Sequence, residues 1–211
     1  MPTPLLVQIR LYLAALRLLL VLTVICGLAY PLLITGFSQL ALDGQANGSR
    51  LERDGQVVGS RLLGQTFDLP KRNPADPEEP ARPDPRWFQP RPSAAGSGYD
   101  PIASGASNLG PDDVGLTTTV RDRRAAVAAF DGVTPEQVPP DAVTASGSGL
   151  DPQISPAYAH QQVNRVAAAR GLEPAVVRRL VEEHVQGRVL GFLGQPRVNV
   201  LALNLALSRL G

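Results

Sequence analysis

The chain has 211 residues, of which 20 are basic and 19 acidic, so its formal net charge is only +1. This balance gives no long-range field that would attract nucleic acid or an acidic substrate, and the few aromatic residues are not interleaved with a basic patch. Cys26 is the only cysteine. A single cysteine excludes an internal disulfide, a paired-cysteine redox motif and a cysteine-based zinc site.

A long apolar segment near the N-terminus predicts a transmembrane helix over residues 11–37. Arg17 is the only charged residue in this segment, and about 20 apolar residues are enough to cross the hydrocarbon core. Arg10 and Arg17 lie at its N-terminal end, and the next basic residue is Arg50. Because cytoplasmic flanks carry the excess of basic residues, residues 1–10 are predicted in the cytoplasm and everything after the helix outside it.

A cleaved signal peptide is the alternative for this segment. Its apolar core would be about 7–15 residues long and would end at a small-residue cleavage site. The segment here is longer, contains Pro31 and lacks a convincing site, so we favour the anchor.

A stripe of small or kink-permitting residues recurs at every fourth position of the predicted helix. Its members are Thr23, Gly27, Pro31 and Thr35. Such a stripe lets a neighbouring helix approach closely, although ordinary small residues of an anchor are an equally good interpretation.

Residues 38–211 are expected to form one extracytoplasmic domain of modest size. The apolar run 57–67 is bounded by glycines and predicts a strand. Residues 70–86 contain six prolines, at positions 70, 74, 77, 80, 83 and 85, which withhold backbone donors and predict an exposed, extended loop outside the core. Trp87 and Phe88 follow as the expected anchors of the next ordered segment.

The second half of the chain is predicted to be mainly helical. Helices are expected over residues 111–130, 155–171 and 173–187. Ser155 caps the second of them and Gly171 ends it, so that the last two helices form a helical hairpin.

Shorter elements complete the predicted domain. Residues 138–146 suggest a strand, and two further strands flank a turn at Gly194–Pro196. The tail is predicted as a helix capped by Asn199, although its alternating leucines also fit a strand. The fold class is therefore α+β: one transmembrane helix followed by a small mixed α/β domain with a helical hairpin.

The residues that enzymes use most often form no recognisable catalytic or metal-binding pattern. His160 and His184 are predicted to be surface histidines, and neither has a companion at metal-ligand spacing. The sequence has no G-x-S-x-G nucleophile elbow and no G-x-x-x-x-G-K-[ST] phosphate loop. The chain is therefore predicted to be non-catalytic alone. A membrane-anchored hydrolase or solute-binding domain that uses the serine-rich loops is the alternative.

Two loops of small residues remain as the candidate site, "YDPIASGASNLGP" at 99–111 and "GSGLDPQISP" at 147–156. Three of their acidic or amide side chains precede turns, where they can accept hydrogen bonds from backbone amides two residues on. The candidate residues, for docking a partner or for holding the loops in shape, are Tyr99, Asp100, Ser104, Ser107, Asn108, Asp151 and Ser155. If the loops dock on a partner, negative charge for a cation would come from Asp100, Asp112, Asp113 and Asp151.

At these residues the chain resembles the C subunit of the Kdp potassium-transporting ATPase. The matching segments are "YPLLITG" (30–36), "QANGS" (45–49), "GSRLLGQTF" (59–67), "WFQPRPSA" (87–94), the first candidate loop, "VTASGSGLDPQISPAYAHQQVNRVAAARGL" (143–172) and "GQPRVNVLALNLAL" (194–207). Two features depart from that family. Residues 70–86 are longer and richer in proline than usual there, and Ala202 stands where the family often has an acidic residue.

The resemblance implies a non-catalytic, single-span subunit of a complex in the bacterial inner membrane that imports potassium with high affinity. Its partners would be a channel-like potassium-binding subunit, a P-type ATPase subunit that hydrolyses ATP, a small single-span subunit and membrane lipid, with no nucleic acid. The subunit would assemble and stabilise the complex, and the resemblance also implies a catalytic chaperone that raises the ATP affinity of the ATPase subunit. It would bind no cofactor alone, since potassium and ATP are handled by the complex.

The predicted topology limits the chaperone role. An extracytoplasmic domain cannot touch a nucleotide in the cytoplasm, so any effect on ATP would be transmitted through the membrane subunits as a coupling between two states. Assembly of the complex and a cap over the ion entrance are therefore favoured over direct nucleotide contact.

Overall fold

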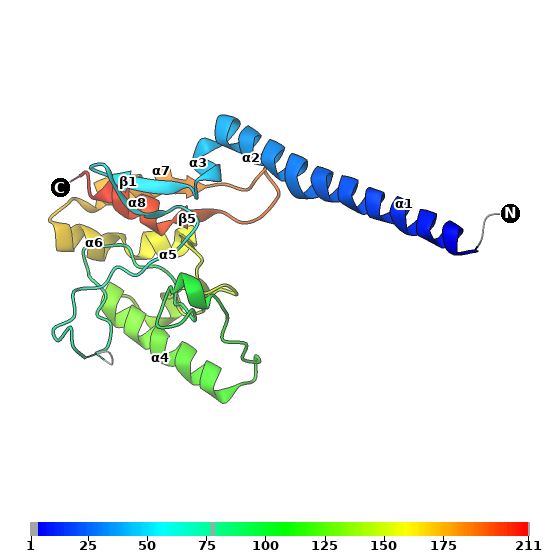
Figure 1. Ribbon diagram of the computed structural model, residues 1–211. Helices are drawn as coiled ribbons and strands as arrows, with labels where there is room; N and C mark the ends of the chain where they lie inside the picture. Colours follow the sequence, from blue (N-terminus) through cyan, green and yellow to red (C-terminus); the bar gives the residue numbers. More distant parts are fainter. Residues whose placement is uncertain (1–3, 77–78, 211) are drawn as a thin grey trace. The chain divides into compact units, whose positions relative to one another are not determined.

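The computed structural model describes residues 4–76 and 79–210. The chain forms two compact units, Met1–Ser49 and Arg50–Gly211, which are described separately (Figure 1). The sequence predicted a domain boundary at residue 38. The second unit begins later because α2 (Tyr30–Ala41) and α3 (Asp43–Ala46) continue the helical segment.

The first unit is an almost continuous apolar helix. It consists of α1 (Pro4–Val24), the π-helical turn η1 (Ile25–Ala29) and α2, with α3 following. By length and composition, Leu5–Ala41 could cross a membrane, and this stretch extends beyond the predicted 11–37 at both ends. Its large apolar side chains are exposed, which suits a helix that lies in lipid or against other helices.

The π-helical turn ends at Ala29, two residues before Pro31. The N–H of Tyr30 donates to the carbonyl of Ile25, five residues earlier. Proline has no N–H, and in a regular α-helix its ring would press against the carbonyl four residues before it. Widening the preceding turn relieves that conflict without breaking the helix. The predicted stripe, Thr23, Gly27, Pro31 and Thr35, lies on this helix, and its packing against a partner stays a prediction.

The second unit begins with a two-stranded antiparallel hairpin. β1 (Arg50–Arg53) pairs with β2 (Gln56–Ser60). Asp54 and Gly55 between them have φ values of 53° and 76°, as a tight two-residue hairpin turn requires. The strand predicted at 57–67 is thus confirmed only as far as Ser60. Its partner β1 was not predicted, although the Asp-Gly pair is a signal for it.

A second, three-stranded antiparallel sheet has the order β3–β5–β4. Its strands are β3 (Gln153–Ile154), β4 (Val185–Gln186) and β5 (Arg197–Asn199). The central strand β5 leads directly into α8 (Val200–Leu207), whose first turn is capped by Asn199: its side-chain oxygen accepts from the N–H of Ala202 at 2.9 Å. The predicted tail helix and its cap are confirmed.

Local signals determine where the other helices begin and end. The Asp113 carboxylate accepts from the N–H of Leu116 at 2.9 Å at the start of α4 (Val114–Asp131). Ser155 Oγ accepts from the N–H of Tyr158 at 3.0 Å at the start of α5 (Pro156–Gln161). Both caps satisfy N–H groups that have no partner inside the helix.

The predicted helical hairpin forms with two differences. The helix expected over 155–171 is interrupted at Gln162, so α5 is followed by α6 (Val163–Arg170), which ends at Gly171 with a left-handed φ of 65°. α7 (Pro174–His184) is shorter than expected because Val185 joins β4. Within the unit, α5 and α6 lie between α4 and the α7–α8 pair (Figure 1).

Residues 138–146, predicted as a strand, contain a 3₁₀ turn instead, η4 (Pro140–Ala142). The N–H of Val143 and the hydroxyl of Thr144 both donate to the Pro140 carbonyl, at 3.2 and 2.8 Å. Two consecutive prolines fix φ and withhold donors that a strand needs. They therefore override the strand preference of the valine and threonine.

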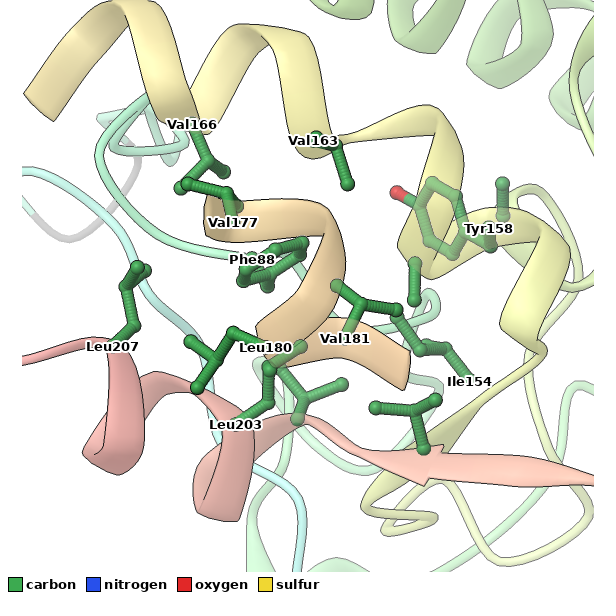
Figure 2. Close-up of a cluster of buried hydrophobic side chains, with 14 of the residues drawn as sticks. Phe88, Ile154, Tyr158, Val163, Val166, Val177, Leu180, Val181, Leu203 and Leu207 are labelled. Atoms are coloured by element: carbon green, nitrogen blue, oxygen red, sulfur yellow. The ribbon is translucent and has the colours of Figure 1, made fainter. Parts of the chain in front are cut away.

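The core lies where α5, α6, α7, α8 and β5 meet (Figure 2). Phe88 is fully buried in it, and Trp87 packs against it, so both predicted anchors are confirmed. α7 contributes the buried side chains of Val177, Leu180 and Val181 to this core. This packing of four helices and one sheet makes the unit α+β, as predicted.

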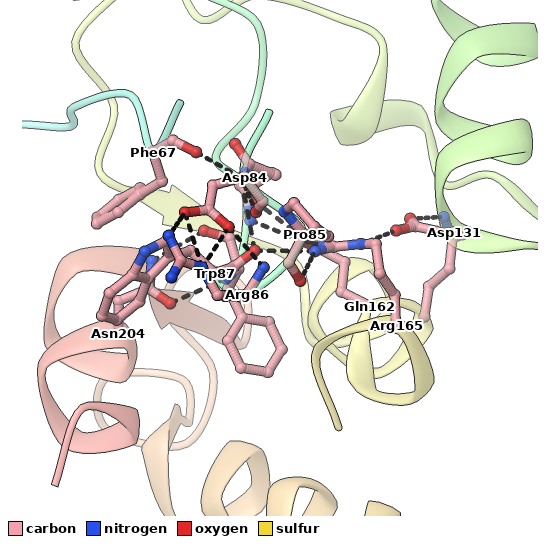
Figure 3. A network of polar contacts seen from close by, with 12 residues as sticks. Phe67, Asp84, Pro85, Arg86, Trp87, Asp131, Gln162, Arg165 and Asn204 are labelled. Carbon is pink, nitrogen blue, oxygen red and sulfur yellow. Dashed lines mark hydrogen bonds and ion pairs between the residues drawn. The ribbon is translucent and has the colours of Figure 1, made fainter. Parts of the chain in front are cut away.

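Two buried side-chain amides, rather than a neighbouring strand, form hydrogen bonds with the backbone N–H and carbonyl groups of Phe88 and Gln89 (Figure 3). Asn204 accepts from the N–H of Phe88 and donates to its carbonyl, both at 2.9 Å. Gln162 does the same with Gln89, at 2.6 and 3.1 Å. Because both amides are fully enclosed, each pairing satisfies polar groups that would otherwise be buried without a partner.

Arg165 joins α4, α6 and the segment before Phe88 at one buried point (Figure 3). Its Nε donates to Asp131 Oδ1 at 2.7 Å. Nη1 donates to the carbonyls of Pro85 and Trp87, at 2.7 and 3.0 Å, and Nη2 to Gln162 Oε1 at 2.6 Å. The side chains of Arg165 and Asp131 are only 7% and 1% exposed.

The proline-rich segment 70–86 is only partly the exposed loop that was predicted. Residues 70–76 are exposed, and 77–78 lie outside the described residues. Asp84, however, is buried and accepts hydrogen bonds from the backbone and guanidinium of Arg86. The guanidinium bond, the largest cause, lowers the pKa of the Asp84 carboxyl. The end of the segment is drawn into the fold because it continues into buried Phe88.

Candidate docking site

The two candidate loops are fastened to each other through small residues. We call residues 91–105 and 145–153 together the loop cluster. Ser104 Oγ and the N–H of Gly105 both donate to the carbonyl of Ser148 at 2.9 Å. Ser93 Oγ donates to the carbonyl of Gly149 at 2.6 Å. A Cβ at Gly149, where φ is 68°, would lie 2.7 Å from backbone atoms of the facing loop, so this close approach requires glycine.

Tyr99 holds the first loop in place. Its φ is 55°, its N–H donates to Ser93 Oγ and its hydroxyl donates to the carbonyl of Arg91, both at 2.8 Å. Burial raises the pKa of Tyr99, so the hydroxyl stays a neutral donor. A Cβ at Gly64 would overlap the Tyr99 ring and lie 2.8 Å from the carbonyl oxygen of Asp151. Gly64 therefore allows both loops to approach the same point.

Asp151 stabilises the turn that leads out of the second loop. Its Oδ1 accepts from the N–H of Gln153 at 3.0 Å, which confirms the predicted side-chain turn. Its Oδ2 lies 3.0 Å from Nη1 of Arg91, and the two side chains are 29% and 20% exposed. Arg91 also donates to the carbonyl of Thr144 at 3.2 Å. The carboxylate thus links the two loops as well as shaping one of them.

Ser155 has a partner that the sequence did not suggest. Its N–H and hydroxyl donate to the two carboxylate oxygens of Asp141, at 2.7 and 2.9 Å. The same hydroxyl caps α5. Because Asp141 follows the prolines of the 138–146 segment, this contact also fixes where that segment turns.

These side chains line an open polar groove of about 480 Å³. The polar groove is lined by Arg91, Asp141, Asp151, Gln153, Ile154, Ser155, Gln195, Pro196 and Arg197. Two arginines and two aspartates give it charge of both signs. Asp141 accepts hydrogen bonds from Ser155, and Asp151 pairs with Arg91. Arg197, in contrast, has no ion pair within the described residues. The arrangement suits recognition of a complementary polar surface.

Only some of the predicted site residues take part in this arrangement. Asp151 and Ser155 line the polar groove, and Tyr99 and Ser104 build the loop cluster. Asp100 Oδ1 accepts from the N–H of Ile102 at 2.9 Å, which confirms its predicted turn.

The remaining predicted residues lie apart from the hydrogen bonds of the cluster. Ser107 and Asn108 are exposed and make no side-chain hydrogen bond within the part of the chain described. Asn108 adopts a left-handed φ of 53°. Of the acids proposed to attract a cation, Asp113 caps α4, and Asp112 is exposed. Among residues 4–76 and 79–210 there is no group of three or more His, Cys, Asp or Glu side chains that could hold a metal ion.

Arg91, Asp141 and Arg197 are the charged groove residues that sequence reasoning missed. The three lie in segments far apart along the chain, so no local spacing marks them as members of one site. Only the position of Arg91 between two prolines hinted at an ordered, extended backbone there.

The sequence predicted two surface histidines, but His160 and His184 are both partly buried. His184 Nδ1 lies 2.8 Å from the carbonyl of Leu180. His160 Nδ1 is buried without a hydrogen-bond partner in the described part of the chain. Neither histidine lines the polar groove, and Ser93 and Ser104 donate to backbone carbonyls.

Ala202 lies in a separate cavity of about 420 Å³. The basic residues that line this cavity are Arg50, Arg61, His184 and Arg209, and Glu52 is the carboxylate among its lining residues. Alanine at 202 thus leaves the cavity predominantly basic.

The chain is similar to known proteins along nearly its whole length. The family model described as "KdpC: K+-transporting ATPase, c chain" matches residues 12–209. The "Potassium-transporting ATPase KdpC subunit" of Kineococcus radiotolerans is 56% identical over 192 residues, which cover 91% of this chain and 90% of that protein. The protein of that name from Streptomyces coelicolor is 50% identical over 212 residues, which cover 95% of this chain and 93% of that protein. The one from Mycobacterium tuberculosis is 50% identical over 202 residues, which cover 95% of this chain and 99% of that protein. The resemblance seen in the sequence motifs is confirmed, and the chain belongs to the KdpC family, the c chain of K+-transporting ATPases.

Proposed function

We propose that the chain is a non-catalytic subunit that assembles and stabilises a potassium-transporting ATPase complex. Membership of the KdpC family supports this role. The other subunits would be a channel-like subunit that binds potassium, a P-type ATPase subunit that hydrolyses ATP and a small single-span subunit. Potassium and ATP would be handled by these subunits, with no cofactor bound by this chain alone.

The polar groove is the observation that carries the proposed docking role. Its walls are held by hydrogen bonds within the loop cluster, so little freedom would be lost when a partner binds. Its charges of both signs favour one register of a complementary surface over others. Arg197 lines the groove and has no ion pair within the described residues, which leaves it available to a partner carboxylate or carbonyl.

In this proposal the N-terminal helix crosses the bacterial inner membrane once, with the N-terminus in the cytoplasm. The basic residues Arg10 and Arg17 and the uncharged stretch that follows support this orientation. The second unit then lies outside the cytoplasm, where it could cap the ion entrance of the channel-like subunit. A chaperone effect on ATP affinity would be exerted through the membrane subunits, as a coupling between two states.

Charge reversal at Arg197 tests the docking proposal. We expect Arg197→Glu to lower the yield of co-purified channel-like and ATPase subunits at least about tenfold, because a side chain that meets a complementary charge is replaced by one that repels it. The matched control is Arg178→Glu, an exposed arginine on α7 that does not line the groove. Equal yields for the two variants, with both chains folded, would show that the polar groove does not dock the partners.

A further inference from the structure

The loop between β4 and β5 displays a cluster of large apolar side chains. We call residues 188–197 the apolar hairpin and residues 189–193 its tip. The tip is closed by reciprocal bonds between the backbones of Val189 and Leu193, both at 2.9 Å. The exposed fractions are 49% for Val189, 82% for Leu190, 71% for Phe192 and 58% for Leu193. The tip is thus an ordered turn whose four large side chains face away from the core.

Such a tip is unfavourable in water. Each large apolar side chain that stays exposed forgoes the favourable free energy of leaving water. Leu190 also has a left-handed φ of 54°, which costs a non-glycine residue additional energy. A run of exposed apolar residues on a defined turn marks a surface that something else covers.

The charges around the tip favour a lipid surface as that cover. Arg188 is exposed directly before the tip. No aspartate or glutamate occurs in the chain after Glu183, so no acidic residue lies close to the tip in the sequence. Exposed apolar side chains next to a basic residue are typical of segments that enter the interface of membranes with anionic lipids.

The N-terminal helix keeps such a surface within reach. α2 ends at Ala41 and the second unit begins at Arg50. At about 3.5 Å per residue, the connection spans at most about 30 Å. If the helix crosses a bilayer, lipid is present at a high effective concentration, so weak insertion by the tip would be sufficient.

We propose that the tip of the apolar hairpin inserts into the interface of the bilayer that the N-terminal helix crosses, with Arg188 at the lipid phosphates. This inference rests on the proposed membrane anchor. Insertion of the tip is a second attachment to the membrane besides the N-terminal helix, and it restricts rotation of the second unit about its short connection to that helix. The polar groove is then presented in a narrower range of orientations, which lowers the orientational cost of binding a partner.

Quenching by spin-labelled lipid tests the insertion. The full-length chain carrying Cys26→Ala and Phe192→Cys is labelled with an environment-sensitive fluorophore and placed in vesicles of phosphatidylcholine and phosphatidylglycerol that contain a lipid labelled within its acyl chain. The matched control carries the probe at Ile102→Cys, an apolar residue that is 95% exposed elsewhere on the same unit. We expect quenching at 192 to exceed that at 102 at least about threefold, because the quencher reaches only groups that enter the bilayer.

The contribution of Arg188 is tested in the same vesicles. Arg188→Glu should weaken insertion at least about fivefold, since a basic residue near an anionic surface contributes about 1 kcal/mol, while Arg188→Lys should retain it. In vesicles of phosphatidylcholine alone, insertion should not differ among the chain with Arg188, Arg188→Glu and Arg188→Lys.

The outcomes separate this inference from the anchor on which it rests. Failure of the chain to float with the vesicles would refute both. Flotation with equal quenching at 192 and 102 would refute insertion alone. Flotation with a probe at 192 that becomes shielded only when the partner subunits are added would show that the tip docks on protein instead of lipid.

Discussion

At the scale of single residues, Arg165 and Asp131 form a buried ion pair that connects several segments of the second unit. Besides its bond to Asp131, the Arg165 guanidinium lies 4.3 Å from the centroid of the Phe130 ring. It also donates to two backbone carbonyls of the segment before Phe88. Removing one partner of a buried pair leaves the other charge without compensation, which costs more than the intact pair contributes.

We expect Asp131→Ala to lower the free energy of unfolding by about 3–5 kcal/mol for this reason. The measurement is urea unfolding of the full-length chain in detergent, followed through the fluorescence of Trp87, its only tryptophan. The control is Glu183→Ala, which removes the pair with Arg179 whose side chains are 74% and 61% exposed. That variant should lose less than about 1 kcal/mol, since solvent screens exposed pairs. Similar losses in both variants would contradict the central role of Arg165.

Residues of this kind could not be identified from the sequence. In the sequence, Gln162 and Asn204 look like ordinary polar residues of helices. Their side-chain amides nevertheless bond the backbone of Gln89 and Phe88, which lie 73 and 116 residues away in the sequence. Arg91 likewise finds Asp151 across 60 residues. Spacing along the chain carries no information on such pairs, because they depend on how the helices pack.

At the scale of elements, glycine decides how closely the loops approach. Gly64 faces the Tyr99 ring and the carbonyl of Asp151, and Gly149 faces the backbone of the other loop. A methyl group at either place would push apart the segments that build the polar groove. Neighbouring Gly147 has open space around the position of a Cβ.

We therefore expect Gly64→Ala to lower the free energy of unfolding by about 1–3 kcal/mol, the usual cost of overpacking. Gly147→Ala should have no destabilising effect, and it is the matched control. Both are measured by the same urea titration. The partner yield of Gly64→Ala should also fall under conditions in which the second unit stays folded. Unchanged stability would mean that the Tyr99 ring can shift without cost.

The elements that were predicted correctly are those with local signals. Asp113, Ser155, Asn199 and Gly171 determine helix ends through bonds or backbone angles within a few residues. The segment 138–146 was predicted incorrectly, because its conformation depends on two prolines and on the contact of Asp141 with Ser155, 14 residues on. β1 had a usable signal in Asp54–Gly55.

At the scale of the whole molecule, the sidedness of the membrane decides which function is possible. A second unit outside the cytoplasm can dock on the entrance side of a transporter, whereas a second unit in the cytoplasm could meet nucleotide. Cys26 lies within the apolar helix, so a cysteine introduced on the second unit can report the sidedness.

Ser97, which is exposed in the loop cluster, is a suitable position. In cells with an intact inner membrane, we expect a membrane-impermeant maleimide to label Ser97→Cys fully and the unsubstituted chain not at all. The reason is that Cys26 would be enclosed by lipid. Labelling of Ser97→Cys only after the inner membrane is opened would reverse the orientation and restore direct nucleotide contact as an explanation.

The pairing of Phe88 with Asn204 also bears on biogenesis. Synthesis proceeds from the N-terminus, so Asn204 in α8 is made 116 residues after Phe88. Until then the backbone of Phe88 lacks its partner and the apolar core stays open, so the second unit cannot complete its fold before α8 has been synthesised. If the second unit lies outside the cytoplasm, as proposed, the chain can therefore reach the translocation machinery before this fold is complete.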